Sequence, residues 1–451
     1  SVIPAPESEC QPRRRREPDK ILEKKYECLY PRGTMRVSVW KFLGAEALPG
    51  ESRKKLAVVA LLYFIQGAPA AILWEVLPVY FRIHGVSLRA IGGLRLLELP
   101  YSLKVFWSPL VHRYGDRRWW MLSCMLGIAC VLFALPWVEV AKVGWIVLLL
   151  ILALTTLSAT QDVAIDSYSV ALVRREEEGA ANGVRASAYR VALVFAGGGL
   201  VFLAAVAEWS VLFILAGFLF ALFGLATLAV PPLQVAEQAR VHWLQGFWQW
   251  AGTWRVIPLI LFVLTYKLGE FAIGPMVKPF WVDYGKNIWP NQDELMFQIG
   301  LFPTSLGIVL SVVGALLGGT FITRYGIFHG VWFLGLLQAA SNLSYALVQW
   351  LDLGRYGLYG ASMFESLSGG LGTAAFLAFL MNVCQKEHAT VQYAFLSSVF
   401  SLTGRLVGAI SGVGAERYGF ANYFALTFLV SMPAYLLLPW IKEWIQEARR
   451  S

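Results

Sequence analysis

Long apolar stretches separated by short polar segments run along the chain from Leu56 onward. Each holds about 20 residues, which is the length that a helix needs to cross the hydrocarbon core of a bilayer. About twelve such stretches are present, and they start near Leu56, Ala90, Trp119, Val143, Val184, Val211, Ile257, Gln298, Phe328, Gly357, Thr390 and Ala421. The pattern predicts an all-α membrane protein with about twelve transmembrane helices.

A long polar interruption after the sixth apolar stretch divides the chain in two. Residues 231–255 follow a proline pair and carry tryptophans among polar residues, which is typical of an amphipathic helix at a membrane interface. We predict a cytoplasmic linker at 231–255 between six-helix halves at 51–230 and 256–446. Residues 1–50 are polar and predict a flexible N-terminal segment.

A short repeat supports two halves with a shared plan. Arg113-Tyr114-Gly115 ends the second apolar stretch, and Arg324-Tyr325-Gly326 ends the eighth. Two six-helix halves of similar plan indicate the major facilitator fold. In such a fold, substrate binds near the midplane between the halves, and transport proceeds by alternating access.

Basic residues orient the predicted helices. Cytoplasmic loops of membrane proteins carry an excess of Lys and Arg, so the net charge of +9 does not indicate a nucleic-acid partner. One set of helix ends holds Arg53, Lys54, Lys55, Arg113, Arg117, Arg118, Arg174, Arg175, Arg240, Arg255, Arg324, Lys386, Lys442, Arg449 and Arg450. The other set holds only Arg82, Arg89, Lys142, Lys286, Arg355 and Arg417. Both termini are therefore predicted to be cytoplasmic.

No sequence motif indicates an enzyme. The five cysteines and five histidines have no metal-ligand spacing, and neither a phosphate-binding loop nor a nucleophile elbow is present. We expect no metal, no cofactor and no catalytic residues.

Two carboxylates lie in the middle of the fourth apolar stretch. Asp162 and Asp166 are four residues apart and share one face of a helix. Carboxylates at membrane depth usually face a bundle interior or a water-filled path, where they relay protons or bind substrate. We predict that Asp162 and Asp166 couple transport to protons, and an ion-pair lock between helices is the alternative.

Several cations also lie within predicted spans. Lys104, Arg190 and Arg405 have no acidic neighbour in sequence, so they need partners on other helices or an anionic ligand. Asp162 and Asp166 are candidate partners. Trp107 lies beside Lys104 at a proline-broken helix end and could stack on a sugar ring. Other charged residues in the predicted spans form local pairs, Arg95 with Glu98 and Lys267 with Glu270. Glu75, Lys278 and Glu365 have no such local partner.

Four segments resemble one known family. They are Leu99-Pro100-Tyr101-Ser102-Leu103-Lys104-Val105-Phe106-Trp107-Ser108-Pro109-Leu110, Ser158-Ala159-Thr160-Gln161-Asp162-Val163-Ala164-Ile165-Asp166, Ala188-Tyr189-Arg190 and Phe364-Glu365-Ser366-Leu367-Ser368-Gly369-Gly370-Leu371-Gly372-Thr373-Ala374-Ala375-Phe376. Together they resemble the AmpG-type muropeptide permeases of the major facilitator superfamily, from about Leu61 to Leu438.

The resemblance implies a proton symporter of the bacterial inner membrane, and we expect the protein to be a monomer. Such a protein imports 1,6-anhydro-muropeptides, and its expected partners are an anionic glycopeptide, protons and membrane lipid. The motif positions that the resemblance carries over are Lys104, Gln161, Asp162, Asp166, Arg190 and Glu365. With Trp107 and Arg405 added, these residues form the predicted substrate and proton sites.

Two other functions stay open at this point. His112 stands where the family has an acidic residue, and Glu75, Arg95 and Glu98 stand where small or apolar residues are expected. A related branch with a similar Gln-Asp motif carries acetyl-coenzyme A, which is also anionic. A membrane receptor or scaffold without transport activity is the third alternative.

Overall fold

A computed structural model describes residues 50–113, 116–174, 177–232, 256–384 and 389–442 and residue 445, all within one compact unit, Pro49–Ser451. Every regular element in these ranges is a helix, which confirms the all-α prediction. Almost all of the predicted N-terminal segment 1–50 and linker 231–255 lies outside the described residues.

The N-terminal half, residues 50–232, begins with a long helix that contains a π-helical turn. That helix comprises α3 (Gly50–Ala71), η1 (Ile72–Val76) and α4 (Leu77–Ile83). The next crossing is broken into α5 (Leu88–Gly93), η2 (Leu94–Glu98), α6 (Leu99–Leu103), η3 (Lys104–Phe106) and α7 (Ser108–Arg113). The remaining helices are α8 (Arg117–Ala134), η4 (Leu135–Trp137), α9 (Trp145–Leu172), α10 (Glu178–Ala192), η6 (Leu193–Gly198), α11 (Gly199–Leu203) and α12 (Trp209–Leu228).

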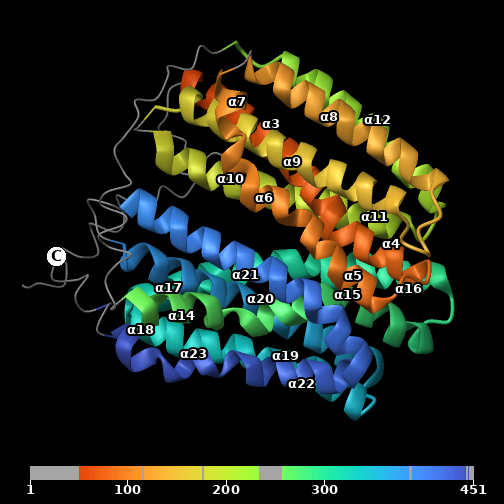
Figure 1. Ribbon diagram of the computed structural model, residues 1–451, viewed down its shortest axis with the longest axis vertical. Helices are drawn as coiled ribbons and strands as arrows, with labels where there is room; N and C mark the ends of the chain where they lie inside the picture. Colours follow the sequence, from red (N-terminus) through yellow and green to blue (C-terminus); the bar gives the residue numbers. More distant parts are fainter. Residues whose placement is uncertain are drawn as a thin grey trace, which may run out of the picture. The chain divides into compact units, whose positions relative to one another are not determined.

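The C-terminal half, residues 256–445, has a similar series of long helices (Figure 1). Its first members are α14 (Val256–Tyr266), α15 (Leu268–Ile288), α16 (Gln292–Ile299), η7 (Gly300–Leu306) and α17 (Gly307–Tyr325). They are followed by α18 (Ile327–His329), η8 (Gly330–Leu334), α19 (Gly335–Trp350), α20 (Gly354–Asn382), α21 (Ala389–Tyr418), α22 (Phe420–Ser431) and α23 (Pro433–Leu436).

Ten helical stretches in the described ranges are long and apolar enough to cross a membrane. They coincide with ten of the predicted stretches. The second predicted stretch is instead a chain of short helices, because Pro100 and Pro109 lack the amide hydrogens that a continuous helix needs. The last is the shorter apolar helix Phe420–Leu436.

The two halves meet closely at one end of the helices. We call the end where α3 and α8 begin the basic end, and the end where α4 finishes the opposite end. Near the opposite end α5 packs along α21 and α4 packs against α15 (Figure 1). A Cβ atom on Gly412 of α21 would lie 1.8 Å from the carbonyl oxygen of Leu88, so only glycine allows this approach.

The apolar cores show the same asymmetry. One core contains residues of both halves near the opposite end, such as Tyr80, Phe280 and Phe424. A second core, which includes Phe262 and Phe379, belongs to the C-terminal half and lies toward the basic end. The apolar packing that joins the halves is therefore concentrated at the opposite end.

Asp116 caps the first turn of α8. Its Oδ1 accepts a hydrogen bond from the Arg118 amide at 3.0 Å, and its Oδ2 accepts from Arg118 Nε at 2.8 Å. These bonds from Arg118 lower the pKa of the Asp116 carboxyl below its ordinary value. The stabilisation is therefore present above the unfolded-state pKa of about 3.9, and it is lost as the pH falls through the lower folded-state pKa.

Replacement of this cap gives a testable result. Asp116→Ala is expected to lower the free energy of unfolding by about 1 kcal/mol at neutral pH. The measurement is thermal unfolding of the detergent-solubilised protein, with Glu139→Ala as a control at an exposed carboxylate. Equal effects of the two substitutions would contradict the capping role.

Candidate functional site

Asp162 is the centre of a polar group in the N-terminal half. It lies in α9, where its Oδ2 accepts a hydrogen bond from Lys104 Nζ at 2.9 Å. Its Oδ1 accepts one from Gln66 Nε2 of α3 at 2.5 Å. Lys104 is in η3, so three separate membrane crossings meet at this carboxylate. The predicted partnership between Asp162 and a cation on another helix is present.

Asp166 lies one helical turn nearer the basic end on the same face of α9. Its Oδ1 accepts a hydrogen bond from the Tyr63 hydroxyl of α3 at 2.6 Å. The guanidinium of Arg185 lies over the Tyr63 ring, 5.3 Å from its centroid. Tyr63 and Gln66 are not among the residues predicted from the sequence, although two polar groups three residues apart in an apolar span are a signal for them.

A cavity lies beside Lys104, between the two halves. Its volume is about 330 Å³, which is within the usual range for a small-molecule site. The N-terminal half lines it with Tyr101, Ser102, Lys104, Ser108 and Val163, and α21 lines it with Ser397, Ser398 and Ser401. Trp107 is close by, where its Nε1 donates to Thr160 Oγ1 at 3.1 Å. The cavity can offer an ammonium group and several hydroxyls to a solute.

Two further predicted cations bridge the halves. Arg405 of α21 donates from Nε to the Glu98 carbonyl oxygen at 2.9 Å, and its Nη1 donates to Ser102 Oγ. Arg190 of α10 donates from Nη1 to Ser311 Oγ of α17 at 3.0 Å. Within the described ranges neither guanidinium has a carboxylate at ion-pair distance. Neither positive charge is therefore neutralised by a direct ion pair, and both lie near the contact between the halves.

Gln161 and Glu365 do not join the group around Asp162. Gln161 is fully buried, and its Nε2 points to Met125 Sδ of α8 at 2.9 Å. Glu365 lies in α20 of the other half, where it is partly buried and its Oε2 accepts from Ser366 Oγ at 3.4 Å.

The C-terminal half also holds a buried lysine. Lys267 Nζ donates to Gln338 Oε1 and Thr373 Oγ1, each at 2.9 Å, and it forms an ion pair with Glu270. Lys267 is only 2% exposed, so this network is satisfied internally. It is a packing element between α15, α19 and α20 rather than an open site.

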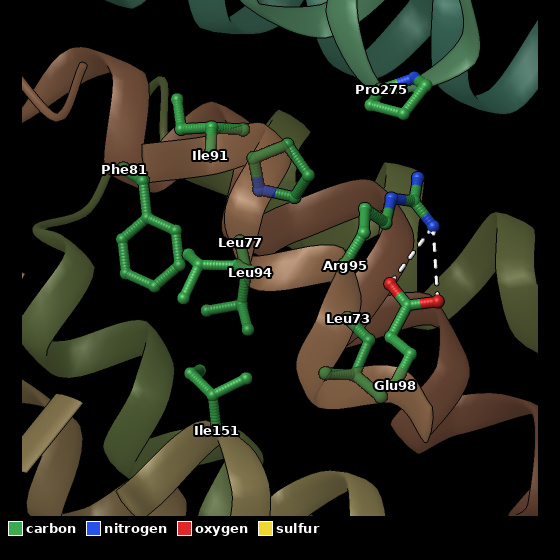
Figure 2. Close-up of a pocket in the computed structure, with 10 residues that line it drawn as sticks. Leu73, Leu77, Phe81, Ile91, Leu94, Arg95, Glu98, Ile151 and Pro275 are labelled. Carbon is green, nitrogen blue, oxygen red and sulfur yellow. Dashed lines mark hydrogen bonds and ion pairs between the residues drawn. The ribbon is translucent and has the colours of Figure 1, made fainter. Parts of the chain in front are cut away.

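A second cavity contains Arg95 and Glu98 but is too small for a solute. Figure 2 shows the Arg95 guanidinium turned to the Glu98 carboxylate, with an Nη1–Oε1 distance of 3.0 Å, among apolar residues that include Leu94 and Ile151. The volume is about 30 Å³, which is close to the volume of one water molecule. The unexpected charges of the second span are thus paired with each other.

Ion pairs connect the two halves on the side away from the basic end. Arg82 at the end of α4 forms a forked pair with Asp283 of α15, with contacts of 2.5–2.9 Å. Arg89 Nε lies 3.2 Å from Glu416 Oε2 of α21. Deeper in the bundle, Glu75 Oε2 lies 2.5 Å from Lys278 Nζ. These contacts join the two halves at the opposite end.

In the described part of the chain, no group of three or more His, Cys, Asp or Glu residues could hold a metal.

The chain is similar to known protein sequences over most of its length. A family model described as Major Facilitator Superfamily matches residues 59–409. The chain is 28% identical over 407 residues to an anhydromuropeptide permease of Escherichia coli (strain K12), with 87% of this chain and 81% of the relative covered. It is 24% identical over 412 residues to a putative transporter, AmpG 4, of Rickettsia felis, with 86% and 97% covered.

Solved structures support the same fold. The crystal structure of the nucleoside transporter NupG matches with a TM-score of 0.68 at 16% identity, covering 87% of this chain and 98% of that one. A D-xylose–proton symporter matches with a TM-score of 0.62 at 11% identity, covering 87% and 95%. The major facilitator fold predicted from the sequence is confirmed, and these likenesses indicate a transporter rather than an enzyme.

Proposed function

Because the chain belongs to the major facilitator superfamily, we propose that it imports anhydro-muropeptides across the bacterial inner membrane by proton-coupled alternating access. The name of the Escherichia coli relative suggests the substrate, and the same substrate suits the cavity chemically. An anhydro-muropeptide carries a carboxylate, on the lactyl group when no peptide is attached and on the peptide when one is, and its sugar rings carry hydroxyl and amide groups. A cavity that offers an ammonium group and serine hydroxyls can bind both kinds of group.

The single observation that carries this proposal is the excess of cations between the halves. Lys104 lines the cavity, while Arg405 and Arg190 lie at the contact between the halves without an acidic partner in the described ranges. Unpaired charges at membrane depth are unfavourable, so an anionic solute between the halves would stabilise them. An anion is therefore the class of solute that this arrangement favours.

The remaining predicted residues receive roles by position. Asp162 and Asp166 take up and release protons, and Trp107 stacks on a sugar ring at the edge of the cavity. Glu365 contributes a carboxylate to the substrate site from the C-terminal half. We leave Gln161 out of the proposed site because its side chain is buried against Met125.

The positive-inside rule assigns the basic end to the cytoplasm. The cavity residues Ser108 and Ser397 lie in the parts of α7 and α21 nearer that end. The ion pairs Arg82–Asp283 and Arg89–Glu416 close the periplasmic side. We therefore assign this structure to an inward-facing state, and breakage of these pairs would accompany the change to the outward-facing state.

Substrate identity is tested by exchange across proteoliposomes, which needs no proton gradient. Liposomes loaded with unlabelled GlcNAc-anhydro-MurNAc are expected to take up the labelled compound, and excess external muropeptide should compete. Acetyl-coenzyme A should not compete at the same concentration. Competition by coenzyme A esters alone would replace the muropeptide with a coenzyme A substrate, and absence of any exchange by folded protein would contradict transport.

A further inference from the structure

Lys104 occupies a position where it can serve two anions in turn. It forms an ion pair with Asp162, and it also lines the cavity between the halves. The Lys104 side chain is 30% exposed and that of Asp162 only 17%, so a solute in the cavity reaches the cation before the carboxylate. We propose that Lys104 exchanges its partner from Asp162 to the anionic group of the substrate, and that Asp162 then takes up the proton that is transported. This inference rests on the proposed function, because it takes the substrate to be an anion.

The two partners of the ion pair are held differently. Asp162 lies within the continuous helix α9, and Gln66 of α3 fixes its second oxygen at 2.5 Å. Lys104 lies in η3, a short turn between two short helices of the broken crossing. A lysine also has a flexible four-carbon stem and an ammonium that donates in several directions. When the pair separates, the lysine is therefore the partner that moves.

The chemical environment of the cavity favours the exchange. Besides Lys104, its lining consists of five serines, including Ser102, and the hydroxyl of Tyr101, from α6, α7 and α21, and one apolar residue. No carboxylate belongs to this lining. Arg405 donates to Ser102, so a second cation lies just behind the wall. An anion that enters is attracted to Lys104 and meets no negative side chain on the lining.

Loss of its cation then favours protonation of Asp162. In the empty site, the ammonium of Lys104 and the carboxylate of Asp162 cancel. If an anion takes the ammonium and nothing else changes, a partly buried carboxylate is left without its cation, which is strongly unfavourable. Uptake of one proton by Asp162 restores the balance, so one anion and one proton occupy the site together.

The other charged and titratable groups near Asp162 do not offer a replacement cation. Tyr63 hydrogen-bonds Asp166, and Arg405 is engaged with Ser102 and Glu98. The groups that act electrostatically on Asp162 or Lys104 from the surrounding helices are Tyr63 on α3, Tyr101 on α6, Asp166 on α9, Tyr189 on α10 and Arg405 on α21. Among the described residues of this set, Arg405 is the only cation besides Lys104, and Arg185 lies over the Tyr63 ring.

The test is the number of protons taken up when substrate binds. Isothermal titration of the purified full-length protein with GlcNAc-anhydro-MurNAc, in buffers of different ionisation enthalpy, gives that number. The parent is expected to take up about one proton per substrate, and its Kd should rise by up to about tenfold per pH unit as the pH increases. Asp162→Asn should bind without proton uptake and with a nearly pH-independent Kd.

Matched variants separate the exchange from a general loss of structure. Asp352→Asn makes the same change away from the cavity, where Asp352 accepts a hydrogen bond from Tyr284, and this variant should still take up a proton on binding. Lys104→Gln removes the shared cation, so substrate should bind more weakly and without proton uptake. Binding by the parent without proton uptake, or unchanged uptake in Asp162→Asn, would overturn the exchange while leaving the proposed substrate intact. If the folded parent does not bind this substrate at all, the proposed substrate is wrong, and so is the proposed exchange of partners by Lys104.

Discussion

Asp162→Asn is expected to abolish accumulation of substrate while leaving exchange intact. A one-proton symporter can concentrate its substrate about tenfold for each unit of pH gradient, since one pH unit corresponds to about 1.4 kcal/mol. Without a titratable carboxylate beside Lys104, the gradient cannot act on the transport cycle. The ratio of internal to external substrate should therefore fall to about one, which is the value for passive equilibration.

The measurement compares two assays on the same proteoliposomes. Uptake driven by an inward proton gradient reports coupling, and exchange of labelled for unlabelled substrate reports movement of the loaded carrier. Asp352→Asn is a matched control, because Asp352 accepts a hydrogen bond from Tyr284 away from the cavity and has a backbone φ of 45° that asparagine tolerates. Accumulation by Asp162→Asn at the level of this control would exclude Asp162 from proton coupling.

Reversal of charge at Arg82 should have the second large effect. The Arg82–Asp283 pair joins α4 to α15 by a forked contact, and the two side chains are 23% and 25% exposed. Hydrogen-bonded charge pairs of this kind are worth about 2 kcal/mol, which corresponds to a shift of roughly thirtyfold in a conformational equilibrium. Arg82→Glu places two carboxylates together and should shift the protein from the inward-facing to the outward-facing state.

A labelling experiment reads out this shift. A single cysteine at Ser102 in the cavity wall, introduced after the five native cysteines are replaced by serine, should react faster with a membrane-impermeant maleimide added from the periplasmic side in Arg82→Glu than in the parent. The swapped pair Arg82→Asp with Asp283→Arg should return the rate toward that of the parent. Lys142→Glu is the control, because its partner Glu139 lies in the same loop of the same half and both are well exposed. Equal rates in all of these variants would show that the pair does not hold the periplasmic side closed.

The fold was largely accessible from the sequence because membrane helices are encoded locally. Apolar stretches of the right length located the helices, and the repeat of Arg113 and Arg324 indicated two halves. The break in the second crossing was harder to predict from the sequence, because the apolar composition of this crossing resembles that of a continuous helix. Pro100 and Pro109 interrupt this crossing, which consists of several short helices.

The residues of the site could be predicted from the sequence only where a charged residue lies within an apolar span. Asp162 and Lys104 were selected because a lone charge in an apolar span needs a partner, and the structure pairs them. The pair Arg82–Asp283 could not be predicted, since its members are 201 residues apart and lie in different halves. Gln161 was predicted as a site residue from motif resemblance and does not face the cavity, because such a resemblance does not say which side of a helix faces the cavity. Its position next to Asp162 turns its side chain toward α8.

The most direct test of the account is uptake of labelled GlcNAc-anhydro-MurNAc into proteoliposomes under an imposed inward proton gradient. Accumulation that an uncoupler abolishes is the predicted result, and it would establish muropeptide–proton symport. No uptake by protein that is folded and correctly oriented, or accumulation that is indifferent to the uncoupler, would contradict it.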